Sequence, residues 1–91
     1  MNEMKPTSLT IYDIDALQNQ YVMKSYWSDA MVINLELIEE FDSAGLQWLT
    51  LVKKNLQAGG HGLTLSGASD DLKDAIDLLG MHSLLGVAHV N

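Results

Sequence analysis

Residues 41–46 read Phe-Asp-Ser-Ala-Gly-Leu, and they separate the two most regular patterns of the chain. Before them, Met31–Leu37 is rich in branched apolar residues, a texture typical of a parallel strand that is covered on both faces. After them, leucine and valine recur at steps of three and four over residues 46–56, which predicts an amphipathic helix. Gly59–Gly60 marks the end of that helix, because glycine accepts the left-handed backbone of a helix terminus. The stretch is therefore a strand-to-helix junction.

The N-terminal part predicts a strand followed by a helix. Ser8–Tyr12 alternates apolar and polar side chains, which favours a short strand with Leu9 and Ile11 directed inward. Ala16–Trp27 follows two aspartates that can cap a helix, and its apolar residues recur at helical spacings. We therefore expect a helix there.

The C-terminal part repeats this alternation. Gly62–Gly67 predicts a third strand, and Ser69 or Asp70 begins a last helix that runs to Gly80. The tail Gly86–Val90 fits either a fourth strand or a packed coil. Alternating strands and helices require crossover connections, so the sequence predicts one α/β domain over residues 1–91, with a small, mostly parallel sheet covered by helices.

Composition excludes several classes of protein. The chain has 91 residues, no cysteine and a formal net charge of −7, so disulfides and thiolate metal sites are excluded. An acidic surface repels phosphate, which argues against a nucleic-acid partner and against an anionic membrane surface. No signal peptide and no apolar run of about 20 residues is visible. We therefore expect a cytoplasmic protein with no direct membrane insertion.

The junction offers a surface for a partner. A carboxylate and a hydroxyl at a helix start can accept its unpaired N–H groups, and small residues in the first turn let another chain approach the backbone. A phosphate on Ser43 would bring about −1.5 to −2 charges to the positive end of the helix, which would tolerate it. The expected partner-binding residues are Asp42, Ser43, Ala44, Gly45 and Gln47.

Asp-Ser-Ala-Gly-Leu at 42–46 resembles the Asp-Ser-x-Gly-Leu signature of STAS domains, which occur in anti-sigma-factor antagonists and at the ends of sulphate transporters. The resemblance extends over roughly residues 30–80, because the surrounding elements follow in the family's order. It implies a STAS-like fold and a non-enzymatic regulatory role in signal transduction and transcription regulation. It also implies that an anti-sigma factor acting as a serine kinase phosphorylates Ser43, and that Asp15 contacts the partner.

The resemblance leaves a second role open. STAS domains also act as constitutive subunits, pressed against the ATPase of a lipid ABC transporter or placed in a chemotaxis signalling system, without phosphorylation. The family has a strand before the one matched by Ser8–Tyr12, and we expect this chain to be too short to hold it, so that the fold is trimmed at the N-terminus. The sheet edge left open would then be covered by a partner or by a second copy in a homodimer.

Nothing in the sequence predicts catalysis, a cofactor or a metal site. The Gly-x-Ser-x-Gly elbow of hydrolases is absent, and no base is placed to activate Ser43. His61, His82 and His89 do not share an element at ligand spacing. Both tryptophans, Trp27 and Trp48, are expected in the core or at its edge.

Overall fold

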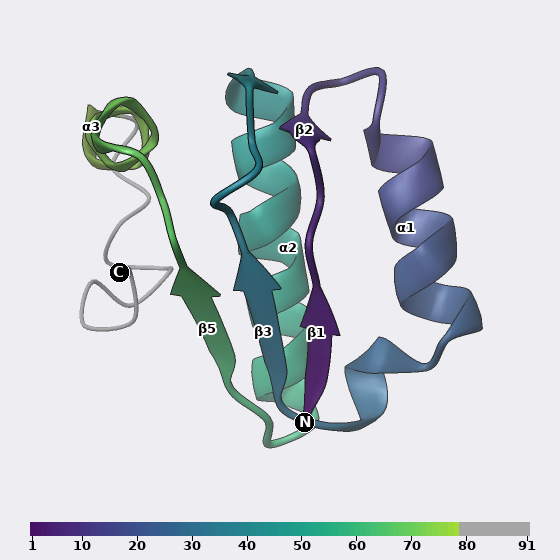
Figure 1. Cartoon of the computed structure of the whole chain (residues 1–91). Helices are drawn as coiled ribbons and strands as arrows, with labels where there is room; N and C mark the ends of the chain where they lie inside the picture. Colours follow the sequence, from purple (N-terminus) through teal and green to yellow (C-terminus); the bar gives the residue numbers. More distant parts are fainter. Residues whose placement is uncertain (79–91) are drawn as a thin grey trace.

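The computed structural model describes residues 1–78, which form a three-stranded parallel sheet with helices packed against it (Figure 1). The sheet consists of β1 (Asn2–Met4), β3 (Met31–Asn34) and β5 (Leu63–Ser66), in the spatial order β1-β3-β5. A second ladder pairs β2 (Ser8–Leu9) with β4 (Glu40–Phe41), also in parallel. The predicted α/β fold with a small parallel sheet is confirmed.

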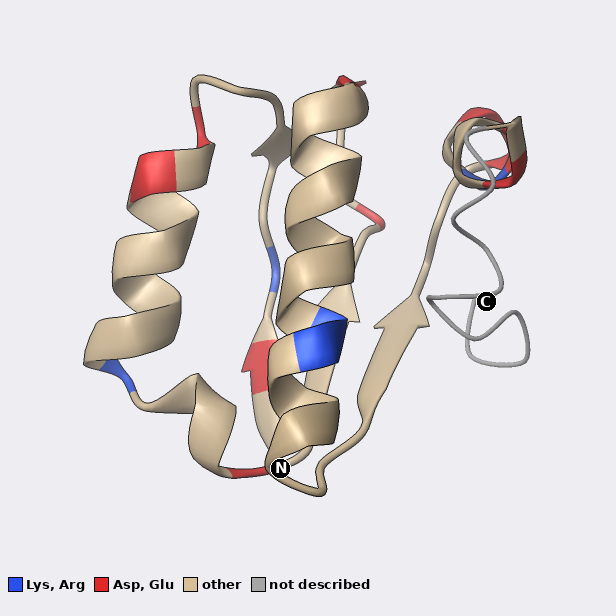
Figure 2. Ribbon diagram, turned by 180° about the vertical axis from the view of Figure 1, so that it is seen from behind, with Lys and Arg blue, Asp and Glu red and all other residues tan. Residues whose placement is uncertain are grey.

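Helices make the crossovers between the parallel strands. Helix α1 (Ile14–Met23) and a 3-10 helix, η1 (Tyr26–Ser28), lead to β3, and α2 (Ser43–Ala58) leads from β4 to β5. Helix α2 lies behind the sheet in Figure 1 and in front of it in Figure 2, whereas α1 lies beside the β1 edge and contacts α2. The last described helix, α3 (Asp70–Leu78), lies beside the β5 edge.

The two C-terminal helices form as their patterns predict. Leu46, Leu49, Val52 and Leu56 of α2 are all buried in the core. Gly60 adopts a φ of +79° after the helix, the left-handed conformation that glycine tolerates best. The Ser69 hydroxyl caps α3 by accepting from the Leu72 N–H at 3.2 Å. The predicted stop at Gly80 and the tail Gly86–Val90 lie outside the described residues.

The first strand differs from the prediction. The sheet strand is β1 at Asn2–Met4, and only two residues of Ser8–Tyr12 are extended. A strand therefore does precede Ser8, contrary to the expectation that the chain is too short to hold one. Leu9 is buried as predicted, but Ile11 is 62% exposed, so its predicted inward orientation is wrong.

The predicted helix over Ala16–Trp27 is shorter than its pattern. It begins at Ile14 and ends at Met23, because Ser25 adopts a left-handed φ of 53° that a continuing helix cannot include. Trp27 falls in η1 and is 50% exposed, so the expectation of a core position is wrong for it. Trp48 is buried, as expected.

The central strand is covered less completely than its apolar texture suggests. Met31 and Ile33 are buried in the hydrophobic core, whereas Val32 and Asn34 are only half-buried. Among the described residues, one face of β3 is therefore buried and the other is only half-buried, so the expectation of two covered faces is not met there. The apolar sequence of β3 is explained by its position between β1 and β5 in the sheet.

Candidate functional site

The predicted site lies at the end of the molecule to which the parallel strands point. Strands β2 and β4 end there, and both α1 and α2 begin there (Figure 1). Binding sites of parallel α/β folds are built outside the carboxyl ends of the strands, because connecting loops and helix starts converge there. The strand-to-helix junction at Asp42–Ser43 is part of this end.

Asp42 ties two segments together. One carboxylate oxygen, Oδ1, accepts from the Gly45 N–H at 2.9 Å and caps α2. The other, Oδ2, accepts from the Ile11 N–H at 2.9 Å, and the Asp42 N–H itself donates to the Leu9 carbonyl at 3.0 Å. The Ile11 and Gly45 N–H groups together hold the pKa of Asp42 below its usual range. The Asp42 carboxylate thus holds the β2–α1 loop against the start of α2 by hydrogen bonds within the domain.

Ser43 is the first residue of α2, and its side chain is exposed. Within residues 1–78 its hydroxyl makes no hydrogen bond, because the capping position is filled by Asp42. The sequence allowed either residue to be the cap. The structure assigns that role to Asp42 and leaves Ser43 exposed, with no hydrogen bond from its hydroxyl among the described residues.

The remaining predicted contact residues of α2 divide into exposed and buried ones. Gln47 is exposed and Ala44 is half-buried, so both can be reached by a partner. Gly45 is buried, and a Cβ there would collide with the backbone carbonyl of Leu9. The expectation that Gly45 leaves the backbone open to a partner is therefore wrong, because Leu9 of the same chain fills that space.

Two apolar residues beside this junction were missed by the sequence argument. The Asp13 carboxylate accepts from the Thr10 N–H at 2.9 Å and from the Thr10 hydroxyl at 2.8 Å, which closes a tight turn. The turn directs Ile11 and Tyr12 outward, and Tyr12 is 93% exposed. A threonine followed three residues later by an aspartate is the signal that favours a turn over a continuing strand.

Carboxylates surround this end of the molecule. Asp13 lies close enough to Asp42 to repel it, and the predicted contact Asp15 is exposed in the first turn of α1. Hydrogen bonds from the Ser8 hydroxyl and from Thr10 hold the pKa of Asp13 below its usual range. Figure 2 shows acidic positions at the start of α1 and on the β3–α2 connection. The two helix starts therefore present negative charge around Ser43.

No metal-binding cluster of three or more His, Asp or Glu side chains occurs in the part of the chain that the structure describes. His82 and His89 lie outside it. Over the same residues, no helix combines the length and the apolar character needed to cross a bilayer.

A protein-family model described as "Mlab, STAS domain" matches residues 7–86. The chain belongs to the STAS domain family. This match covers the β2–α1 loop, the Asp42–Leu46 motif and all of α2, so the residues that form the site lie within the family region.

Solved structures share the STAS fold at low sequence identity. A sulfate transporter family protein from Wolinella succinogenes superposes with a TM-score of 0.82 at 20% identity, covering 98% of this chain and 74% of that one. The murine anion transporter Slc26a9 in its inward-facing state gives a TM-score of 0.82 at 14% identity. That superposition covers 97% of this chain but only 15% of Slc26a9. No curated protein gives a significant sequence match.

STAS domains are in general regulatory or binding modules. Such modules bind through residues exposed at the surface of the domain. On this surface, the predicted residues Asp42, Ser43, Ala44 and Gln47 lie together at the start of α2, while Asp15 lies on the neighbouring helix start.

Proposed function

We propose that this STAS domain is a non-enzymatic regulatory module that binds a protein partner through the start of α2, and that phosphorylation of Ser43 weakens the complex. One observation carries the proposal. The Ser43 hydroxyl is exposed and uncommitted within residues 1–78, whereas its neighbour Asp42 makes the structural hydrogen bonds. The serine can therefore be modified, or covered by a partner, without breaking a contact that holds the fold.

The surroundings of Ser43 are suited to a protein surface. Ile11 is held next to Asp42 by its N–H hydrogen bond, and it exposes 62% of its surface together with the almost fully exposed Tyr12. Exposed apolar and aromatic side chains beside a polar rim are typical anchors of protein interfaces. Gln47 and Ala44 extend this surface by one helical turn.

Phosphorylation would act through charge and bulk at the centre of that surface. A phosphate adds about −1.5 to −2 charges, which the N-terminus of α2 stabilises in the free domain. In a closely packed complex the same dianion would lose its water and lie among the carboxylates of Asp13 and Asp42. The free state is therefore favoured over the complex.

Catalysis by Ser43 has no support in the described residues. A serine nucleophile needs a hydrogen-bonded base, and the Ser43 hydroxyl has no hydrogen-bond partner there. The serine acts as a substrate for modification and as a contact.

The test begins with partner capture. The full chain, as wild type and as Ser43→Ala, Ser43→Asp and Ser69→Asp, is immobilised and exposed to extract from the cells that produce it. Retained proteins are quantified by mass spectrometry, and the recovered partner is then titrated by calorimetry. We expect Ser43→Asp to weaken binding at least tenfold, about 1.4 kcal/mol, and Ser43→Ala to bind nearly as the wild type.

Ser69→Asp is the matched control. It adds the same charge at an exposed helix start, and aspartate can replace serine as the cap of α3. It should bind like the wild type. Equal affinities of Ser43→Asp and Ser43→Ala would contradict the charge switch. A further variant, Ser43→Trp, adds bulk without charge, and if it bound the partner as tightly as the wild type, the interface would lie elsewhere.

A constitutive transporter subunit is the second candidate. It is favoured by the family description "Mlab, STAS domain" and by two solved neighbours whose titles name transporters. In that case the surface around Ser43 would bind a transporter ATPase rather than an anti-sigma factor that acts as a serine kinase. Capture of an ATPase, together with intact mass spectra of the cellular protein that lack an added phosphate, would select this alternative.

A further inference from the structure

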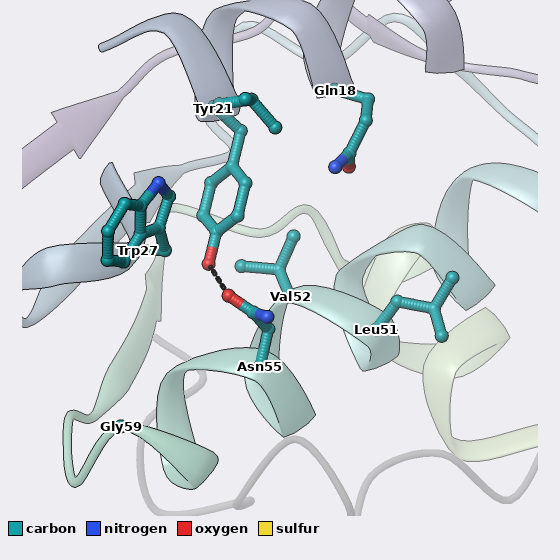
Figure 3. A pocket seen from close by; sticks show the side chains of 8 residues that line it. Gln18, Tyr21, Trp27, Leu51, Val52, Asn55 and Gly59 are labelled. Atoms are coloured by element: carbon teal, nitrogen blue, oxygen red, sulfur yellow. Dashed lines mark hydrogen bonds between the residues drawn. The ribbon is translucent and has the colours of Figure 1, made fainter. Parts of the chain in front are cut away.

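A second apolar surface lies on the helical face, away from Ser43. Helices α1, α2 and η1 enclose a groove of about 590 Å³, shown in Figure 3. Its walls include Val22, Trp27 and Leu51, which are 51%, 50% and 62% exposed. Leu51 lies eight residues after Ser43, which corresponds to about 12 Å along the axis of α2. The groove is therefore displaced from Ser43 along α2, and its near end lies about one helical turn from Gln47 and Asp15 of the proposed partner surface.

Polar side chains that line the groove present hydrogen-bond donors. The Tyr21 hydroxyl donates to Asn55 Oδ1 at 2.7 Å, the bond drawn in Figure 3. The indole Nε1 of Trp48, which can only donate, bonds to Gln18 Oε1 at 2.8 Å. Both amide oxygens are thus used, and the NH₂ groups of Gln18 and Asn55 are left to donate to a ligand.

The rim of the groove adds positive charge. Lys54 lies three residues after Leu51 on α2, and Lys24 directly follows the end of α1, so each is close in the chain to residues that line the groove. Figure 2 shows basic positions at the end of α1 and on the second half of α2. Asp29 beyond η1 is paired with the N-terminal amino group at 3.1 Å, while Asp15 borders the end nearest Ser43. Basic groups therefore flank an apolar groove in a chain whose net charge is −7.

Half-exposed apolar walls flanked by lysines indicate which kind of ligand the groove can bind. Small molecules bind in sites that enclose most of their surface, and walls that are half exposed cannot do so. An amphipathic helix can bury one apolar stripe between two helices and leave its flanking charges at the rim. We propose that the groove is a second docking surface, which binds an amphipathic helix of a partner protein with apolar residues on one face and acidic residues on both sides of it.

The test uses two synthetic peptides and the full chain. Each peptide has about 18 residues, enough for about 27 Å of helix, with leucines at i, i+3, i+4 and i+7. One carries glutamate beside the leucine stripe, and the other carries lysine at the same positions. Binding is followed by NMR chemical shifts of the Trp27 indole and of the amides on α1 and α2. We expect the glutamate peptide to bind at least about tenfold more tightly than the lysine peptide.

Two variants test whether the peptides bind in the groove. Leu51→Gln should lower the affinity for the glutamate peptide several-fold. Lys54→Glu should lower the affinity for the glutamate peptide and raise the affinity for the lysine peptide. Leu37→Gln, at a 45% exposed leucine outside the groove, and Lys73→Glu on α3 are the matched controls and should change little. All four positions are exposed, so we expect each variant to keep the fold, which circular dichroism of each variant checks.

Several results would overturn the inference. These are no shift at Trp27 up to about 1 mM glutamate peptide, equal affinity for the two peptides, or shifts confined to the start of α2. Sedimentation that shows a dimer abolished by Leu51→Gln would assign the groove to a second copy of the chain instead. Ser43→Asp should leave peptide binding unchanged, so this test can fail or succeed independently of the proposed function.

Discussion

Replacement of Gly45 by alanine tests the contact that sets the position of the β2–α1 loop. A Cβ at this residue would collide with the backbone carbonyl of Leu9 and would lie 2.9 Å from the Leu9 Cβ. The obstacle is main chain, which is itself held by the hydrogen bond from the Asp42 N–H to the Leu9 carbonyl. The helix start and the loop must therefore move apart.

The expected loss of stability follows from two opposed effects. Overpacking a well-filled contact costs about 3 kcal/mol when backbone has to shift, and alanine recovers about 1 kcal/mol over glycine inside a helix. The free energy of unfolding should therefore fall by about 2 kcal/mol, which in a domain of this size lowers Tm by about 8–16 °C.

The assay is urea unfolding followed by circular dichroism, with Gly59→Ala as the control. At Gly59 the nearest obstacle to a Cβ is the His61 ring at 3.2 Å, the end of a side chain that can rotate. This control should change stability by less than about 0.5 kcal/mol. If Gly45→Ala is as stable as the wild type, the close packing of Leu9 on α2 does not exist and the account of the motif glycine fails.

Two further predictions concern the hydrogen bonds of Asp42 and of Tyr21. The pKa of Asp42 is held low by the Ile11 and Gly45 N–H groups, so its carboxylate stabilises the fold above the unfolded-state pKa of about 3.9, and this contribution is lost as pH falls through the lower folded value. As the pH falls from about 5 to about 2.5, the urea midpoint of Asp42→Asn should therefore decrease less than that of the wild type. The same decrease in both proteins would contradict the assignment. Tyr21→Phe removes the 2.7 Å bond to Asn55 and should lower the free energy of unfolding by about 0.5–1.5 kcal/mol in urea titrations at pH 7, and no change would show that water replaces it fully.

The elements that could be predicted from the sequence are those whose signals are local. Helix α2 has its apolar stripe, its Asp42 cap and its Gly60 terminus within one continuous stretch, so its bounds follow from residues 42–60 alone. Strand β5 and helix α3 are defined in the same way by neighbouring residues. The parallel sheet then follows, because crossovers are the connections that these alternating elements permit.

The elements that were missed depend on contacts between distant residues. Strand β1 is three residues long and partly polar, and it is a strand because Asn2–Met4 pairs with Met31–Ile33 of β3. Ile11 continues an apolar alternation in the sequence, yet the Thr10–Asp13 turn directs it outward and Asp42 holds it there. No pattern within a few residues encodes the second of these contacts.

The motif at residues 42–46 contains residues that stabilise the fold and one exposed serine. Asp42 caps α2 and binds the Ile11 N–H, Gly45 lies against the Leu9 backbone, and Leu46 is 1% exposed in the core. Packing and hydrogen bonding within the domain account for all three. Among the four fixed residues of the motif, Ser43 alone is exposed and makes no side-chain hydrogen bond or core contact within residues 1–78. A match to the whole motif is therefore evidence for the STAS fold, whereas the choice between a phosphorylated regulator and a constitutive subunit depends on the serine alone. Binding measurements at Ser43 bear on that choice, and stability measurements at its neighbours do not.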